Sequence, residues 1–241
     1  MVLLIYIDNC IIVWPSIVDI DAFVQSMKNV PEKFVLSEKG GINKFLGIEI
    51  NHIYEKIFKV SQHFLIDRII SLLNIDTNNY GMDTNAKSVL VGNPLLQKNL
   101  SGKLRKEAWK YRMAVGMLNY LQGNICPEMS MAVHKTSRFC NIPMLSHKKY
   151  IKRLRTYFFH ANKEGIIYNP YISKGLECYV DSDFAGGWSQ EVGDDADNVI
   201  SRTRMVIMYD KFPVYWRRSL QTEISLSTDE ADYIALSSAM R

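Results

Sequence analysis

The chain has 241 residues, 47% of them hydrophobic, which predicts a globular protein with one large domain or two modest ones. Its 29 Lys and Arg exceed its 25 Asp and Glu by only +4, so net charge permits a nucleic-acid partner without indicating one. The four cysteines lack paired spacing, which argues against a zinc ribbon or a disulfide scaffold and favours reduced, intracellular thiols.

Two apolar runs, Leu3 to Tyr6 and Cys10 to Trp14, flank a short polar break near the start of the chain. This pattern predicts a β-hairpin with Asp8 and Asn9 at its turn. Asp8 could ligate Mg²⁺ there, although Asp and Asn are also ordinary turn formers. Because the break interrupts the apolar opening and no basic leader is present, we expect neither a signal peptide nor a membrane span. We also expect that further sequence precedes this hairpin, since a core hairpin normally has other strands beside it.

Helical periodicity dominates the chain from the first hairpin to about residue 160. A helix is predicted over Asp19 to Met27, then a short strand and a second hairpin with a polar turn. Four amphipathic helices follow, the first with Ser61 as its N-cap, and a long loop from about Asn74 to Gly102 precedes the second. The predicted ranges are Phe34 to Leu36 for the strand, Phe45 to Ile50 and Ile57 to Val60 for the hairpin with its turn over Asn51 to Lys56, and Ser61 to Leu73, Lys106 to Gln122, Pro127 to Phe139 and Ser146 to His160 for the helices.

Strand patterns replace helical ones beyond Gly165. The change near residues 163 to 165 predicts two domains, residues 1–164 and residues 165–241, in an α+β chain. The predicted strands are Ile166 to Tyr168, Leu176 to Val180, Val199 to Tyr209 and Val214 to Trp216, and a last helix begins near Ser227.

Acidic residues recur at two places in the second domain. Asp181 and Asp183 lie two residues apart on one strand, so both carboxylates could face one metal, although acids at strand ends are also common turn formers. Ser227 and Glu230 fit the capping box of a helix start, which gives Glu230 a structural role. Asp232 has no such explanation and could project toward Asp181, as in a nuclease that holds two metal ions.

The most basic stretch is the predicted helix that carries Lys148, Lys149, Lys152 and Arg155 beside an apolar stripe. Such a helix can contact the phosphates of a nucleic acid. A solvated helix surface with no partner is the alternative interpretation of the same pattern.

Six short motifs follow one another along essentially the whole chain: Tyr6–Asn9, Phe45–Ile50, Val60–Gln62, Tyr111–Leu121, Tyr179–Trp188 and Ser225–Tyr233. In this order they resemble the Pol polyproteins of copia-type long-terminal-repeat retrotransposons. Each motif is weak alone, and the specificity comes from six in register.

The resemblance implies the C-terminal part of a reverse transcriptase over residues 1–164, with a partial palm hairpin, a primer-grip-like hairpin, and thumb and connection helices. Over residues 165–241 it implies the first part of a ribonuclease H domain, an incomplete mixed sheet with one helix. Asp8 then resembles the first acid of the polymerase Y-x-D-D turn, Asp181 the first nuclease Asp, and Asp232 the nuclease Glu, with Asp183 as a further Mg²⁺ ligand. The implied partner is an RNA/DNA hybrid or primer–template, contacted by the basic helix.

Three residues depart from the family pattern. Asn9 stands where the family has a second Asp, and a neutral amide is a poorer Mg²⁺ ligand than a carboxylate. Asp232 is one methylene shorter than the Glu it replaces. Arg204 stands at a position where the pattern has Gly. We also expect that the upstream polymerase acid and the last nuclease acid lie outside this chain.

The sequence therefore predicts a piece of a retrotransposon RNA-directed DNA polymerase with ribonuclease H, inactive in isolation. Two alternatives stay open at this point: a catalytically silent nucleic-acid-binding module, and a translated remnant without function.

Overall fold

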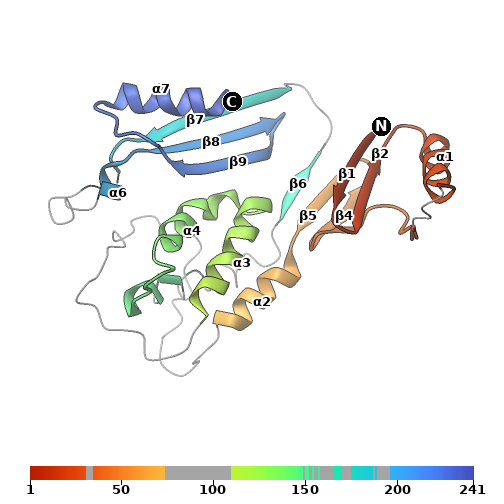
Figure 1. Cartoon of the computed structure of the whole chain (residues 1–241), viewed down its shortest axis with the longest axis horizontal. Helices are drawn as coiled ribbons and strands as arrows, with labels where there is room; N and C mark the ends of the chain where they lie inside the picture. The colour runs from red at the N-terminus through yellow and green to blue at the C-terminus, as the bar shows by residue number, and fades with distance from the viewer. Residues whose placement is uncertain are drawn as a thin grey trace.

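A computed structural model describes residues 1–30, 35–73, 110–148, 165–169, 175–186 and 196–241, together with residues 150, 151, 154, 157 and 188. Within these residues the chain is α+β, as predicted, with six α-helices and three antiparallel sheets (Figure 1). No helix in the described ranges is long and apolar enough to cross a membrane.

The first sheet is a two-stranded hairpin of β1 (Val2–Tyr6) and β2 (Asn9–Val13). Tyr6 pairs with Asn9, so the two-residue turn consists of Ile7 and Asp8, one residue earlier than predicted. Asn9 belongs to β2 because it continues the ladder, and Ile7 adopts the positive φ of 50° that the turn requires. Helix α1 (Ile17–Lys28) follows, as predicted.

The second sheet has the order β3-β4-β5-β6, with β3 (Lys44–Phe45), β4 (Ile48–Tyr54), β5 (Ile57–Ser61) and β6 (Ile166–Tyr168). Residues Leu46 and Gly47, both with positive φ, form the tight turn between β3 and β4. The predicted polar turn over Asn51 to Lys56 is too long. The ladder with β5 continues to Tyr54, which leaves only two residues for the turn.

Helices α2 (His63–Leu73), α3 (Tyr111–Asn124) and α4 (Ser130–Ser137) hold the hydrophobic core, and the one-turn helix η1 (Pro127–Met129) leads into α4. The described residues between 145 and 157 are helical as well and add buried side chains to it. The core side chains buried most completely include Ile66, Ile69, Tyr111, Leu118, Leu121, Met129, Ile151 and Leu154. The four predicted helices are confirmed where the structure describes them.

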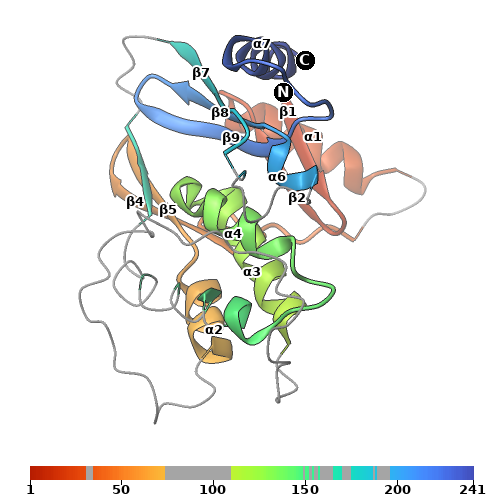
Figure 2. The ribbon, with the colours of Figure 1, turned by 90° about the vertical axis from the view of Figure 1, so that its left-hand side faces the viewer.

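The third sheet has the order β7-β8-β9, from β7 (Leu176–Asp183), β8 (Arg202–Tyr209) and β9 (Phe212–Leu220). Its described strands are antiparallel throughout, where a mixed sheet was predicted, because each strand pairs with the next along the chain. Helix α7 (Thr228–Ala239) lies on one side of this sheet and α4 on the other (Figures 1 and 2).

Three local predictions are wrong. Ser61 does not cap α2, because it is the buried last residue of β5 and its hydroxyl has no hydrogen-bond partner among the described residues. Val35 and Leu36 lie outside any strand, while Phe34 falls outside the described residues. In addition, Val199 ends the short helix α6 (Ala196–Val199) rather than beginning β8. These errors share a cause, since local patterns do not fix element boundaries.

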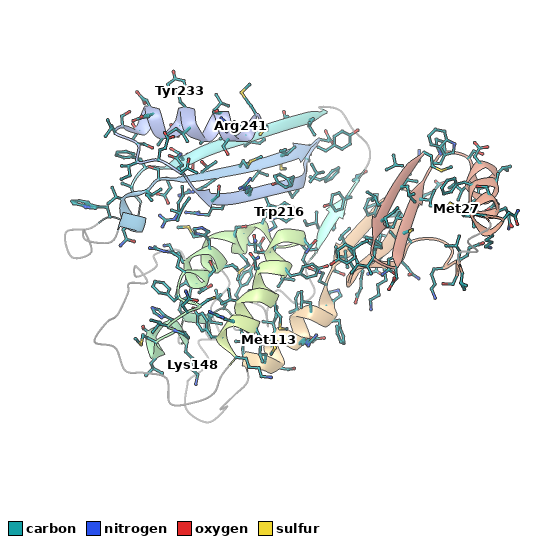
Figure 3. All side chains as sticks on the ribbon, viewed as in Figure 1. Met27, Met113, Lys148, Trp216, Tyr233 and Arg241 are labelled. Atoms are coloured by element: carbon teal, nitrogen blue, oxygen red, sulfur yellow. The ribbon has the colours of Figure 1, made fainter. Side chains whose placement is uncertain are left out.

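Contacts join the sheets and helices across the predicted domain boundary. β6, assigned to the second domain by the prediction, pairs with β5 of the second sheet. The indole N–H of Trp216 in β9 donates to the carbonyl oxygen of Gln122 in α3 over 2.6 Å, and Figure 3 shows Trp216 between the two layers. The division at residue 164 stays a prediction.

Candidate carboxylate site

Asp8 lies at the exposed turn of the first hairpin. None of the residues in β1, β2 or α1 is buried, so nothing in this hairpin excludes water from the carboxylate. In the part of the chain that the structure describes, no group of three or more His, Cys, Asp or Glu side chains is placed to hold a metal ion. Asp8 therefore stands apart from the other predicted acids.

Asp181 and Asp183 lie on the same face of β7, as the two-residue spacing predicts. The guanidinium of Arg204, directly opposite Asp181 on β8, reaches both carboxylates. Its Nη1 is 3.4 Å from Oδ2 of Asp181 and its Nη2 is 2.8 Å from Oδ2 of Asp183. Arg218, which pairs with Arg204 from β9, places its Nη2 3.1 Å from the same oxygen of Asp183.

Burial makes the ion pairs of Asp183 stronger than that of Asp181. The side chain of Asp183 is 18% exposed and that of Arg218 only 9%, whereas Asp181 is 64% exposed. Burial, with repulsion from Arg204, lowers the pKa of Arg218 to about 10. The attraction of Asp183 opposes that shift, so Asp183 is the main counter-ion of a buried arginine.

Helix α4 adds two more basic side chains to this face of the sheet. Burial lowers the pKa of Lys135, and repulsion from Arg218 and Arg202 lowers it further. Burial together with Arg202, Arg218 and Arg138 lowers the pKa of His134 to about 4, so its imidazole is neutral at pH 7. The carboxylate pair thus lies in surroundings that are strongly positive.

The turn after β7 passes close to the carboxylate of Asp183. A Cβ atom built on Gly186 would overlap that carboxylate, so a larger residue there would require the Asp183 side chain to move. The backbone N–H of Ala185 donates to the hydroxyl of Ser201 over 3.3 Å, and this bond holds the turn against the segment before β8.

Asp232 lies on the other side of the sheet. The hydroxyl of Ser182 donates to its Oδ1 over 2.5 Å, and Ser182 points away from Asp181 and Asp183 because side chains alternate along a strand. The expectation that Asp232 projects toward Asp181 is therefore wrong: α7 packs on the face of Ser182. The predicted capping box is present in a shifted form: the N–H of Glu230 donates to Ser227 over 3.1 Å as predicted, and the Glu230 carboxylate accepts from the N–H of Leu226, one residue before the N-cap.

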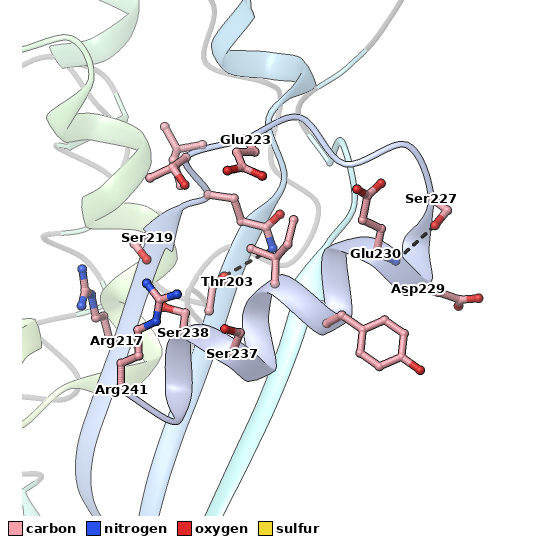
Figure 4. A pocket seen from close by; sticks show the side chains of 15 residues that line it. Thr203, Arg217, Ser219, Glu223, Ser227, Asp229, Glu230, Ser237, Ser238 and Arg241 are labelled. Atoms are coloured by element: carbon pink, nitrogen blue, oxygen red, sulfur yellow. Dashed lines mark hydrogen bonds between the residues drawn. The ribbon is translucent and has the colours of Figure 1, made fainter.

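A hollow between β9 and α7 lies beside this helix (Figure 4). Its walls carry both signs of charge, with Arg217 and Arg241 opposite Asp229 and Glu230. None of the predicted site residues lines it.

The basic helix is only partly described. Lys148 is 6% exposed, so its side chain does not contribute to a solvent-facing surface in this structure. It lies three residues before Ile151 and therefore on the same helix face as that core residue. Lys149, Lys152 and Arg155 lie outside the described residues, and their nucleic-acid role stays a prediction.

The sequence is similar to retrovirus-related Pol polyproteins over nearly its whole length. It is 25% identical to that of transposon RE1 of Arabidopsis thaliana over 96% of the chain, and 27% identical to that of transposon TNT 1-94 of Nicotiana tabacum over 98%. The predicted resemblance to copia-type Pol polyproteins is confirmed. The chain spans only 14 to 17% of the length of these Pol polyproteins.

A different kind of relative matches about half of the chain. The secreted RxLR effector protein 161 of Plasmopara viticola is 29% identical over 54% of this chain and 85% of its own length. No family model matches the sequence. No solved structure matches it either.

The similarity to Pol polyproteins does not assign roles to single residues, and the catalytic roles of Asp8, Asp181 and Asp232 stay predictions. The sequence also contained the partners of the carboxylates without showing them as partners. Arg204 appeared only as a departure from a pattern, and Arg218 had no role in the prediction. The register of two successive hairpins, β7 with β8 and β8 with β9, is the signal that could have placed both beside Asp183.

Proposed function

We propose that the chain corresponds to the C-terminal part of a reverse transcriptase followed by the first part of a ribonuclease H domain. We further propose that as an isolated protein it neither copies nor cuts nucleic acid. The similarity to Pol polyproteins over 96 to 98% of the chain and the order of the six motifs support the assignment. The proposed lack of catalysis rests on the arrangement of the acids.

The position of Asp232 is the observation that carries the proposal for the nuclease part. Two-metal hydrolysis needs carboxylates that converge on a scissile phosphate. Asp232 accepts a hydrogen bond from Ser182 on one face of the sheet, while Asp181 and Asp183 are ion-paired with arginines on the other. These acids do not fit a shared Mg²⁺ ion, and we derive no step that uses one.

In the polymerase part, the described residues do not bring a second carboxylate to Asp8. Asp8 lies on a hairpin without buried residues, and its neighbour Asn9 supplies a neutral side chain from β2. Coordination of Mg²⁺ by a single exposed carboxylate is weak, because water competes for every remaining ligand position. Phosphoryl transfer at this turn is therefore not expected from the chain alone.

Two assays test this proposal with the purified 241-residue protein. One follows cleavage of a labelled RNA/DNA hybrid, and the other follows primer extension on an RNA template, each with Mg²⁺ or Mn²⁺. We expect no product above that of the variants Asp181→Asn and Asp8→Asn, which control for contaminating enzymes. Product that appears with the wild-type chain and disappears with the matching variant would overturn the proposal.

The proposed nucleic-acid partner is an RNA/DNA hybrid or a primer–template, which the chain binds without catalysing a reaction. Support comes from the similarity to Pol polyproteins and from the basic residues Lys149, Lys152 and Arg155. Binding through phosphates weakens as salt rises, because bound counterions are released. Fluorescence anisotropy at several salt concentrations tests this partner, and replacement of the three cations by Gln should reduce both affinity and salt dependence. An affinity that does not change with salt concentration, or that stays the same after the three residues are replaced, contradicts the proposed partner.

A further inference from the structure

We propose that Arg204 takes the place of a divalent cation between Asp181 and Asp183, so that the carboxylate pair is closed to metal ions by the protein itself. One guanidinium spans both side chains, with its Nη1 3.4 Å from Asp181 and its Nη2 2.8 Å from Asp183. A planar guanidinium offers five N–H donors in a fixed geometry that can contact two carboxylates at once. From its position on β8, Arg204 offsets one of the two negative charges, and Arg218 brings the second positive charge to Asp183.

Neighbouring charges reinforce this exclusion. Arg218 contacts the same Oδ2 atom of Asp183 at 3.1 Å and is nine-tenths buried. Lys135 of α4 also lies within electrostatic reach of Asp183, Arg202 and Arg204. A divalent ion would therefore meet at least two guanidinium groups on the carboxylates and further positive charge around them.

The fold keeps Arg204 and the carboxylates together. Cross-strand pairing puts Arg204 opposite both Asp181 on β7 and Arg218 on β9. Gly186 allows the chain to pass close to the Asp183 carboxylate. The arrangement therefore comes from sheet register and one tight turn, and it needs no external ligand.

This inference deepens the proposed function, since it concerns the acids assigned to the nuclease part, but its test does not use activity. Binding of Mn²⁺ is measured by electron paramagnetic resonance on the full chain and on the variant Arg204→Gln/Arg218→Gln. Glutamine keeps much of the side-chain volume while it removes the charge. Arg217→Gln is the matched control, because Arg217 is the neighbouring exposed arginine on β9 and points to the other face.

We expect the double variant to bind Mn²⁺ at least about tenfold more tightly than the wild type, since two positive charges leave the carboxylates. Arg217→Gln should leave the affinity unchanged, and adding Asp183→Asn to the double variant should remove the gain. A folded double variant without this gain, or an equal gain in Arg217→Gln, overturns the inference.

The wild-type chain provides a second test that does not depend on the folding of a variant with two substitutions. If Arg204 closes the pair, Asp181→Asn leaves the Mn²⁺ affinity of the chain unchanged. A wild-type Mn²⁺ signal that Asp181→Asn abolishes would overturn the inference. The nuclease assay can fail or succeed independently of this result, so the two proposals remain distinguishable.

Discussion

The opening hairpin and the third sheet both present a predicted Mg²⁺-binding acid at the end of an apolar strand, yet the surroundings of the two acids differ. Asp8 lies in the turn between β1 and β2, two strands in which no residue is buried. Asp183 ends β7 in a sheet covered on both sides by helices (Figure 2), and two arginines contact its carboxylate. An acid at the end of an apolar strand thus lies in a solvent-exposed turn in one region and in an ion-paired cluster in the other.

Packing partners account for the difference. Strand β1 consists of apolar and aromatic residues on both faces, and all five are exposed. A run of apolar, β-branched and aromatic residues predicts extended backbone, whereas burial needs a second layer against the strand. The third sheet has such layers, because α7 covers one face and the helical core lies against the other. Stability should therefore respond to substitution in one region far more than in the other.

The largest contrast is expected between two leucines. Leu118→Ala removes a side chain that is 1% exposed in the core of α3, which should lower the free energy of unfolding by about 2 to 5 kcal/mol. Leu4→Ala changes an exposed residue of β1 and should cost no more than about 0.5 kcal/mol. Urea denaturation followed by circular dichroism measures both, and equal losses would show that the hairpin is packed in solution. A cooperative transition would also count against a remnant that does not fold.

The two predicted acids give the next contrast. Asp183→Asn leaves the buried Arg218 without its main counter-ion, and we expect a loss of about 1 to 3 kcal/mol, reduced from the cost of breaking a fully buried pair because Arg204 is partly exposed. Asp8→Asn removes an exposed turn charge and should change stability by less than about 0.5 kcal/mol. Thermal melts at low and high salt check both values. An Asp183→Asn variant as stable as the wild type contradicts the ion-paired cluster.

The pH dependence of stability isolates His134. Its pKa is about 4 in the folded chain, below its ordinary value of 6.5, because of burial and nearby arginines. Between these two values the unfolded chain binds more protons, so stability falls as pH decreases from about 6.5 toward 4. Since the ring is partly exposed, we expect a loss on the order of 1 kcal/mol over this window.

His134→Gln should flatten this part of the pH profile, measured as the urea midpoint at each pH. His52→Gln, at an exposed position in β4, is the matched control and should leave the slope as it is. If the slope of stability against pH changes equally in both variants, the pH dependence does not come specifically from His134.

The smallest contrast is between two helix caps. Ser227→Ala removes the cap of α7, where the Glu230 carboxylate completes the capping box, and should cost about 1 kcal/mol. Ser16 caps α1 through a longer bond of 3.3 Å, but α1 has no buried residues, so Ser16→Ala should change global stability by only a few tenths of a kcal/mol. Denaturant titrations of both variants test the ranking, and a larger loss for Ser16→Ala would reverse it.

Local patterns predicted much of this architecture. The periodicity of α1, the helices of the core and the capping box at Ser227 all depend on residues within one or two turns of each other, and all are observed. The shared face of Asp181 and Asp183 also follows from strand alternation alone. Lys148 could have been placed correctly in the same way, since its spacing from Ile151 and Leu154 puts it on the core face.

Such local patterns could not predict contacts between elements that are distant in sequence. Whether Asp232 meets Asp181 depends on which face of the sheet α7 covers, and nothing within α7 encodes that choice. The arginine partners of Asp183 come from two further strands, so their placement requires the register of the whole sheet. The site therefore differs from its prediction in the contacts between elements that are distant in sequence.

The hydrogen bond between the Trp216 indole and the Gln122 carbonyl oxygen makes the fluorescence of Trp216 sensitive to the contact between β9 and α3. An indole whose N–H is held by a carbonyl between two layers emits at a different wavelength from one that faces water. Separation of the third sheet from the helices would move this emission while the helices themselves stayed intact. The chain has four tryptophans, so a variant that keeps only Trp216 is needed for this measurement. In that variant, fluorescence compared with circular dichroism reports whether the third sheet and the helices separate before either one melts.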